Sequence, residues 1–348
     1  MHNRLRIFAI NDRQVISRVN KITIDDIARD LGISKTTVSR SISGKGRISR
    51  KTRRMVLDYI KEHDYTPNPI ARGLAQSKTY NIGWVVPGDS ENFSLPYFQL
   101  TMFGMCEAAQ TENYDVLLIM SFDSDVSRLE NMLRNRKVDG VVLGRTWEND
   151  MNIKTLKESG LPFVVIGGTT EPDVVQIDND HIAACSELTS IILMKGADKL
   201  AFICGNSAQV VNKTREAGFI KGLENCGKER KDALIYNNCD TALQIERATD
   251  EAMRSGADCI VCADDFIAQS VLAKLSRDGI EIPTDIKIAS FYNSALLEHN
   301  RPPVTSIKYD PRQLGFEAAR TLISMIGGEE VQPKKLLGYE VVLKGSTL

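Results

Sequence analysis

Beyond residue 79, the sequence alternates short apolar runs with stretches of helical periodicity. The runs are rich in Val, Ile and Leu and lack the strict polar–apolar alternation of a sheet with one face in water. Such runs are typical of parallel strands that helices cover on both faces. The predicted strands lie at 82–86, 115–120, 140–143, 163–166, 199–204, 233–236, 259–263 and 287–290. The predicted helices lie at 96–112, 127–136, 180–195, 213–226, 243–254 and 264–277.

These elements divide into two α/β lobes. Lobe 1 is predicted at about 80–177 and lobe 2 at about 178–304. The segments 305–307 and 339–343 are predicted to be strands that cross back between the lobes, so lobe 1 also receives a C-terminal return. Ligands of open parallel sheets bind outside the carboxyl ends of the strands, and two facing lobes turn that position into a cleft. Residues 79–348 are therefore predicted to form one two-lobed ligand-binding domain.

Charge is distributed unevenly along the chain. Residues 1–78 contain 17 Lys and Arg against 7 Asp and Glu, whereas residues 79–348 contain 27 against 38. A basic end attached to an acidic body favours contact between that end and a polyanion such as nucleic acid.

Composition argues against several other classes of protein. Seven cysteines at scattered positions do not suggest a disulfide framework. Cys259 and Cys262 lie within a predicted buried strand, where packing is the expected role rather than redox chemistry or zinc binding. We predict no cofactor and no metal. Without an apolar run of eighteen residues or a secretory signal, we expect a cytoplasmic protein that has no membrane partner.

The segment 21–66 has the pattern of a helix-turn-helix head. Thr23 is predicted to cap a first helix at 24–31, and Gly32 to end it in the left-handed conformation. Ser34 is predicted to cap a second, short helix at 35–43. A third helix is predicted to begin near Ser49 and to close the core. Its apolar stripe consists of Met55, Val56, Tyr59 and Ile60.

The second helix presents a polar and basic face. Lys35, Thr36 and Arg40 are predicted to read base edges in a major groove, where arginine can make a bidentate contact with guanine. The side chains predicted to contact phosphates, which position a protein without reading sequence, are Thr23, Ser34, Thr37, Ser39 and Tyr65. The alternative is that the hydroxyls only cap and solvate the helices.

The head resembles that of the lactose-repressor/galactose-repressor family of transcriptional regulators. The resemblance rests on Thr23-Ile24-Asp25-Asp26-Ile27-Ala28, on Gly32-Ile33-Ser34-Lys35-Thr36-Thr37-Val38-Ser39-Arg40, and on Tyr65-x-Pro67-Asn68-x-x-Ala71-x-x-Leu74. It implies that residues 67–78 form a hinge helix that folds on operator DNA and pairs with its dimer mate. Asn68, Ala71 and Leu74 would then line the minor groove, with Leu74 as an apolar wedge.

The body, at about 80–343, resembles the two-lobed sensor of the same family, which has the fold of periplasmic binding proteins. The resemblance implies an N-terminal all-α helix-turn-helix head with a hinge helix, followed by an α/β sensor with parallel sheets. Carried over by position, the effector-binding residues are Tyr97, Phe98, Arg215, Asp264, Tyr292 and Asn293. The alternatives are core packing for the aromatic residues, a surface ion pair for Arg215 and helix capping for Asp264.

The family's sugar-responsive members often carry an aspartate where this chain has Tyr292 and Asn293. The effector is therefore expected to be a sugar or sugar derivative, with a different compound as the alternative. The predicted function is that of a repressor that binds a near-palindromic operator as a homodimer under allosteric control. No long coiled coil follows Leu343, so a dimer is expected rather than a tetramer. Its predicted partners are double-stranded operator DNA and a small-molecule effector, with a corepressor protein as the alternative to the small molecule.

Two other classes fit less well. An enzyme would need a paired acid and base, but the carboxylates at 264 and 265 diverge at a helix start, and the histidines have no metal-binding spacing. A transport binding protein would need export and would have no DNA-binding head. Residues 1–20 match nothing in the family head and are expected to be a disordered basic arm or an artefact of the start codon.

Overall fold

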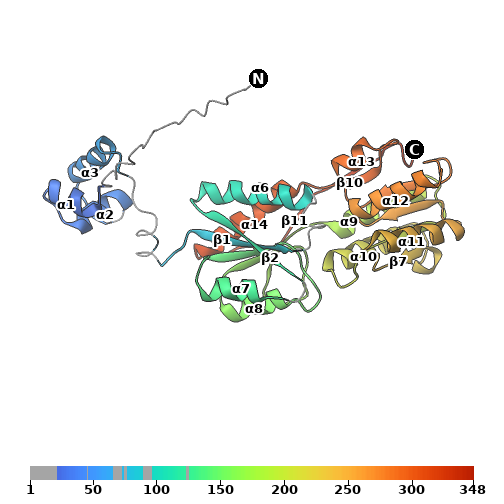
Figure 1. The fold of residues 1–348 in the computed structure, drawn as a ribbon, viewed down its shortest axis with the longest axis horizontal. Coiled ribbons are helices and arrows are strands. Elements are labelled where there is room, and N and C mark those ends of the chain that lie inside the picture. Colours follow the sequence, from blue (N-terminus) through green and yellow to red (C-terminus); the bar gives the residue numbers. More distant parts are fainter. Residues whose placement is uncertain (1–21, 45, 66–72, 74–76, 89–95, 123–124) are drawn as a thin grey trace, which may run out of the picture. The chain divides into compact units, whose positions relative to one another are not determined.

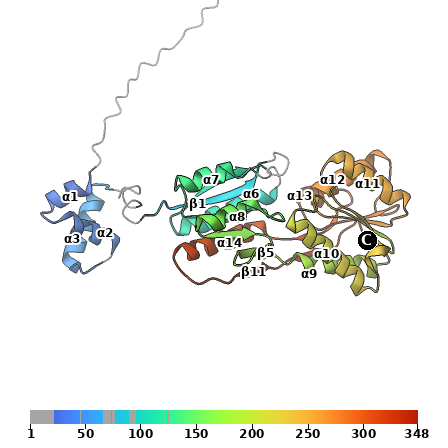
Figure 2. The ribbon, with the colours of Figure 1, turned by 90° about the horizontal axis from the view of Figure 1, so that it is seen from below.

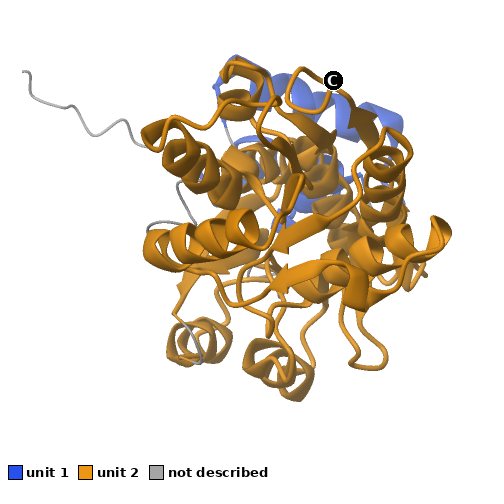
Figure 3. Ribbon diagram, turned by 90° about the vertical axis from the view of Figure 1, so that its right-hand side faces the viewer, with its two compact units in different colours: residues 1–77 blue, residues 78–348 orange. Residues whose placement is uncertain are grey.

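The computed structural model describes residues 22–44, 46–65, 73, 77–88, 96–122 and 125–348. The chain splits into two compact units, Met1–Ser77 and Lys78–Leu348 (Figure 3). The expected N-terminal extension lies outside the described residues, as do the hinge residues Asn68, Ala71 and Leu74. Within the described part of the chain, no helix is both long enough and apolar enough to cross a membrane.

The first unit contains the three predicted helices of the head, α1 (Ile24–Asp30), α2 (Lys35–Ser43) and α3 (Arg50–Glu62). The Thr23 side chain accepts a hydrogen bond from the Asp26 amide and starts α1 with the predicted capping box. Gly32 then turns the chain with a φ of 64°. The helix-turn-helix prediction is confirmed.

Buried side chains from all three helices form the core of the head. Ile27, Val38 and Val56 are fully buried at its centre. Met55, which we expected in this core, is 38% exposed. The apolar stripe of α3 runs through Val56, Tyr59 and Ile60, and a helix that turns 100° per residue places position 55 at the solvent edge of that stripe.

Lobe 1 of the second unit is a parallel six-stranded sheet in the order β11-β5-β4-β3-β1-β2. Its strands are β1 (Asn81–Pro87), β2 (Asp115–Ser121), β3 (Gly140–Leu143), β4 (Phe163–Ile166), β5 (Val175–Asn179) and β11 (Lys334–Leu337). Figure 1 shows α6 (Pro96–Thr111) and α14 (Pro311–Ile326) on one face, and α7 (Ser127–Arg134) and α8 (Met151–Ser159) on the other.

Lobe 2 repeats this architecture in a six-stranded sheet of order β12-β10-β9-β8-β6-β7, in which only β12 runs antiparallel to its neighbour. Its strands are β6 (Leu200–Ile203), β7 (Leu234–Tyr236), β8 (Cys259–Cys262), β9 (Lys287–Ser290), β10 (Thr305–Lys308) and β12 (Glu340–Val342). In Figure 2, α9 (His181–Met194) and α10 (Val210–Asn225) cover one face, and α11 (Ala242–Arg254) and α12 (Asp265–Arg277) the other. The short α13 (Ala295–His299) precedes β10. The predicted fold class of two α/β lobes with parallel sheets is confirmed.

The chain passes between the lobes three times: after β5, after β10 and between β11 and β12. Sequence reasoning missed β5 and β11, as well as the helices α8 and α14. The two strands lie at one side of their sheet and carry polar residues, such as Gln176 and Lys334, in place of a continuous apolar run.

Two glycines bring the backbones of α6 and α14 into direct contact. A Cβ atom built on Gly315 would lie 2.0 Å from the carbonyl oxygen of Thr101. A Cβ atom on Gly104 would lie 1.8 Å from the carbonyl oxygen of Arg312. No side chain fits at either position. The close contact between the two helices therefore fixes the position of α6, whose first residues lie at the cleft.

Candidate functional site

The predicted DNA-reading residues share one face of α2. Lys35, Thr36, Ser39 and Arg40 are exposed, while Val38 on the opposite face is fully buried in the head core. The Arg40 side chain runs beside Gly46, where an added Cβ would lie 3.2 Å from Arg40 Cδ. The core thus fixes α2 so that its polar, basic face meets solvent.

Several of the hydroxyl groups predicted to contact phosphates have local partners. Ser34 Oγ accepts a hydrogen bond from the Thr37 amide at 3.1 Å, which makes it the N-cap of α2, and it lies 2.9 Å from Thr37 Oγ1. Thr23 caps α1 in the same way. Tyr65 is half-buried against the head core, and burial raises the pKa of its phenol. Capping is therefore observed, and phosphate contact by these residues stays a prediction.

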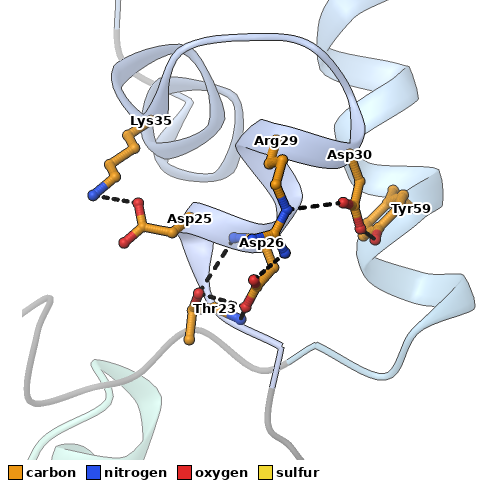
Figure 4. Close-up of polar contacts among 7 residues, drawn as sticks. All are labelled: Thr23, Asp25, Asp26, Arg29, Asp30, Lys35 and Tyr59. Atoms are coloured by element: carbon orange, nitrogen blue, oxygen red, sulfur yellow. Dashed lines mark hydrogen bonds and ion pairs between the residues drawn. The ribbon is translucent and has the colours of Figure 1, made fainter.

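Three carboxylates of α1 have different surroundings (Figure 4). Asp26 completes the capping box and pairs with Arg29. Asp30 accepts a hydrogen bond from the Tyr59 hydroxyl at 2.6 Å, which ties α1 to α3. Asp25 forms an ion pair with Lys35, the first residue of α2. Sequence reasoning did not single out Asp25, because this pair depends on how the two helices pack.

In the sensor, four of the predicted effector-binding residues come together at the carboxyl ends of the strands. The ring of Tyr97, at the start of α6, meets the ring of Tyr292 edge-on with centroids 5.9 Å apart. Tyr97 packs against the cores of both lobes. On α10, Arg215 Nη1 lies 3.8 Å from Oδ2 of Asp264, which follows β8. The topology therefore joins side chains of both lobes in one polar, aromatic site.

Arg215 is the most informative member of this site. Its side chain is buried, and its Nε has no hydrogen-bond partner among the described residues. Burial acts to lower the pKa of Arg215, but the Asp264 carboxylate together with Tyr309, Cys185 and Cys204 outweighs it and the pKa is raised, so the guanidinium remains charged. A buried guanidinium whose Nε has no hydrogen-bond partner is suited to an acceptor atom supplied by a ligand.

Asp264 combines two of the roles that the sequence left open. Its carboxylate accepts a hydrogen bond from the Ile267 amide at 3.0 Å and so caps α12, while it also faces Arg215. Phe98 is buried in the core of lobe 1 beside Trp84. The Asn293 side chain bonds to Glu298 and Ser306. The effector roles of Phe98 and Asn293 stay predictions, and the site's geometry supports Tyr97, Arg215, Asp264 and Tyr292 more directly.

Several buried polar groups of the site were not among the predicted effector-binding residues. Asp265 is 2% exposed, and its Oδ2 has no partner within the described residues. Burial and then the charge of Asp264 raise the pKa of Asp265. His181 lies between Asp178 (Nε2 to Oδ1, 3.4 Å) and Tyr309 (Nδ1 to Oη, 3.1 Å). Asp178 and Tyr309 lie where the chain crosses between lobes, in or after strands whose ends the sequence did not predict.

Aromatic and cationic groups continue the site on lobe 1. The Arg145 guanidinium lies 5.6 Å from the centroid of the Phe98 ring and 6.0 Å from that of Trp147. Both Arg145 and Trp147 follow β3 and line a cavity of about 140 Å³, together with Pro87 and Phe122. Burial raises the pKa values of Tyr97 and Tyr292, so both phenols are neutral hydrogen-bond donors.

Beside this cavity, residues of the two lobes also contact each other directly. Trp147 forms a β-bridge with Gln209, and the Glu148 amide donates to the Ala208 carbonyl at 2.9 Å. Glu148 also forms an ion pair with Lys213 of α10. We call residues 146–148 and 208–210 the interlobe bridge. Among the described residues, no group of three or more His, Cys, Asp or Glu side chains is placed to hold a metal ion.

Comparison with known proteins matches both units. Residues 23–68 match bacterial regulatory proteins of the lacI family, and residues 191–347 match the periplasmic binding protein-like domain. Catabolite control protein A of Streptococcus mutans is 30% identical over 94% of this chain and 98% of its own length. The HTH-type transcriptional regulator CelR of Thermobifida fusca is 28% identical over 92% of this chain and 97% of its own.

Solved structures show the same architecture. The complex of transcriptional regulator CelR with cellobiose has a TM-score of 0.72 and 27% identity, over 93% of this chain and 99% of that one. The lac repressor dimer bound to operator has a TM-score of 0.77, over 94% of this chain and 99% of that one. Its sequence identity is 21%, so this similarity shows the fold alone. With a relative at 30% identity over nearly its full length, the chain belongs to the lacI family of bacterial regulatory proteins, and it is a DNA-binding transcriptional regulator rather than an enzyme.

Proposed function

We propose that this regulator is a cytoplasmic repressor that binds a near-palindromic operator as a homodimer, and that a small molecule in the sensor cleft controls its affinity for DNA. The exposed polar face of α2 supports the DNA-reading part of the proposal. In it, Lys35, Thr36 and Arg40 contact base edges from a helix whose other face is fixed by the head core.

The observation that carries the effector part is the buried Arg215 guanidinium with its unpaired Nε. A charged donor in this position costs free energy unless a ligand supplies an acceptor. Tyr97 and Tyr292 add aromatic rings, which suit the apolar faces of a sugar ring, and neutral hydroxyl groups, which can bond to its hydroxyls. The similar CelR was solved with cellobiose, which supports a sugar or sugar derivative as the effector class here.

Exposed apolar side chains support dimer formation. Phe103 on α6 is 53% exposed, and Leu100 on the same helix and Leu118 on β2 are more than a third exposed. In lobe 2, Leu243 and Leu296 are 59% and 58% exposed. A second copy of the chain would cover such residues across a two-fold axis, and two symmetric heads would bind two half-sites.

The test begins with selection of bound fragments from genomic DNA by the purified full chain. Metabolites are then screened for thermal stabilisation of the protein and for a change in its affinity for the selected fragment. Enrichment of an inverted repeat and stabilisation by a sugar support the proposal. Failure to prefer any duplex over random competitor, with or without metabolites, would overturn it. Release by a protein fraction, with no stabilisation by any metabolite, would point to the corepressor protein instead.

Arg40→Ala tests the reading role of α2. Loss of a bidentate contact costs about 1–3 kcal/mol and relaxes the preference at one operator position. Arg54→Ala is the matched control, because Arg54 is an exposed arginine on α3 outside the reading face. An equal loss on operator and random DNA in Arg40→Ala would contradict base reading and indicate a phosphate contact.

A further inference from the structure

Asp25 places a carboxylate beside the leading cation of the DNA-reading helix. It lies in the first turn of α1, and its side chain is 56% exposed. Its partner is Lys35, the first residue of α2, whose side chain is 68% exposed (Figure 4). The pair therefore lies at the N-terminal end of the reading face, where side chains meet base edges.

The other acids of α1 have structural tasks that Asp25 does not share. Asp26 closes the capping box with Thr23, and Asp30 binds the Tyr59 hydroxyl on α3. Asp25 favours the start of α1 through the helix dipole, an effect that any acid in the first turn supplies and that is small at an exposed site. The contact with Lys35 across to α2 is not needed to begin or anchor α1.

A lysine on its own discriminates weakly between phosphates and base edges. Its ammonium is a point charge on a flexible stem, so it binds phosphate oxygens as readily as the acceptors of a base. A carboxylate at its side restricts the ammonium, repels phosphate and adds an acceptor that can take a hydrogen bond from an exocyclic amino group.

The major-groove edge of a G·C pair is complementary to this arrangement. Guanine presents acceptors at N7 and O6, which suit Lys35, and cytosine presents a donor at N4, which suits Asp25. The ammonium has three donors and the carboxylate several lone pairs, so each group can contact a base while the two remain paired. Building on the proposed reading role of Lys35, we propose that Asp25 is a specificity-determining residue and that the Asp25–Lys35 pair reads one G·C pair in each operator half-site.

Asp25→Asn in the full chain tests this proposal, with Asp58→Asn as the matched control. Asp58 is an exposed acid of the same head that pairs with Arg54 on α3, so both variants remove one negative charge. Affinity is measured on the selected operator, on operators changed at each single position in both half-sites, and on random duplex, at several salt concentrations. Melting of each variant checks that the head remains folded.

We expect Asp25→Asn to bind random duplex more tightly and with a salt dependence steeper by about one released ion, because Lys35 is freed for phosphate. The preference for G·C at one position, expected at about five-fold or more in the parent, should fall toward one. Lys35→Met should lose the preference at the same position, and the double variant should lose no more than either single one.

An Asp25→Asn variant that keeps every base preference overturns the proposal, as does an equal change in Asp58→Asn. These outcomes differ from failure of the proposed function, in which the parent itself shows no preference for any duplex.

Discussion

Gly315→Ala should destabilise the sensor, although alanine is the better helix former. Inside a helix, alanine is favoured over glycine by about 1 kcal/mol. At position 315, however, the new Cβ would lie 2.0 Å from the carbonyl oxygen of Thr101. An ordinary contact needs roughly 3.4 Å or more, so α6 and α14 must separate by about 1 Å or more.

The atom in the way belongs to the backbone, which cannot rotate aside as a side chain can. Overpacking of this kind costs about 1–3 kcal/mol, and a rigid obstacle favours a value near or beyond the upper end. After the gain in helix propensity is subtracted, we expect a net loss of about 2 kcal/mol. For a unit of this size that loss lowers the melting temperature by roughly 4–8 °C.

Gly338→Ala is the matched control, since a Cβ atom added to Gly338 would have no heavy atom within 4 Å and its φ is not in the left-handed region. Thermal melting by circular dichroism should show that the control is neutral or slightly stabilised and that Gly315→Ala is destabilised. A Gly315→Ala variant as stable as the parent would refute the argument that backbone contact fixes these two helices. Because α6 begins beside Tyr97, effector affinity should fall in the same variant.

Three further changes test the cleft. Arg215→Met removes the buried guanidinium, so effector affinity measured by calorimetry should fall about 10-fold or more. Asp265→Asn removes a carboxyl whose raised pKa makes ionisation unfavourable in the folded state. The stability given by its neutral form is complete below the ordinary pKa near 3.8 and is lost as the pH rises through the higher folded value, so the variant should melt progressively higher than the parent as the pH rises above that ordinary pKa. Glu148→Gln breaks the ion pair with Lys213 in the interlobe bridge, so effector affinity should change by a few-fold in titrations at low salt and less at high salt.

Controls separate these effects from general damage. Arg230→Met removes an exposed arginine of lobe 2 and should leave effector affinity unchanged. Glu229→Gln removes an exposed acid that pairs with Lys231, away from the interlobe bridge, and should likewise have no effect. Parallel melting curves for Asp265→Asn and the parent over the whole pH range would show that Asp265 does not titrate as its burial implies.

Local signals in the sequence were sufficient to predict the helices of the head and most strands of the sensor. The caps at Thr23 and Ser34 and the turn at Gly32 depend on neighbouring residues, so the helix boundaries could be predicted closely. The strand β8 was predictable because its four residues are all buried and apolar.

What escaped prediction depends on pairing between distant segments. The strand β5 is held by pairing with β4 and with β11. In the second pair, Gln176 lies opposite Lys334, which is far along the chain. For the same reason Asp178 and Tyr309 were missed, although Arg215 and Asp264 were found by their positions in family motifs. The Asp25–Lys35 pair was missed because both residues are polar and exposed, and only the packing of α1 against α2 brings them together.

The three passages of the chain between the lobes have a consequence for biosynthesis. Lobe 1 lacks the edge strand of its sheet until residues 334–337 have left the ribosome, after almost all of lobe 2 has been translated. Within the sensor, lobe 1 therefore cannot complete its sheet before most of lobe 2 has been made, although the N-terminal part of a protein usually folds first. Nascent lobe 1 exposes the open side of β5 while lobe 2 is being made, and chaperone demand should be greatest in that interval.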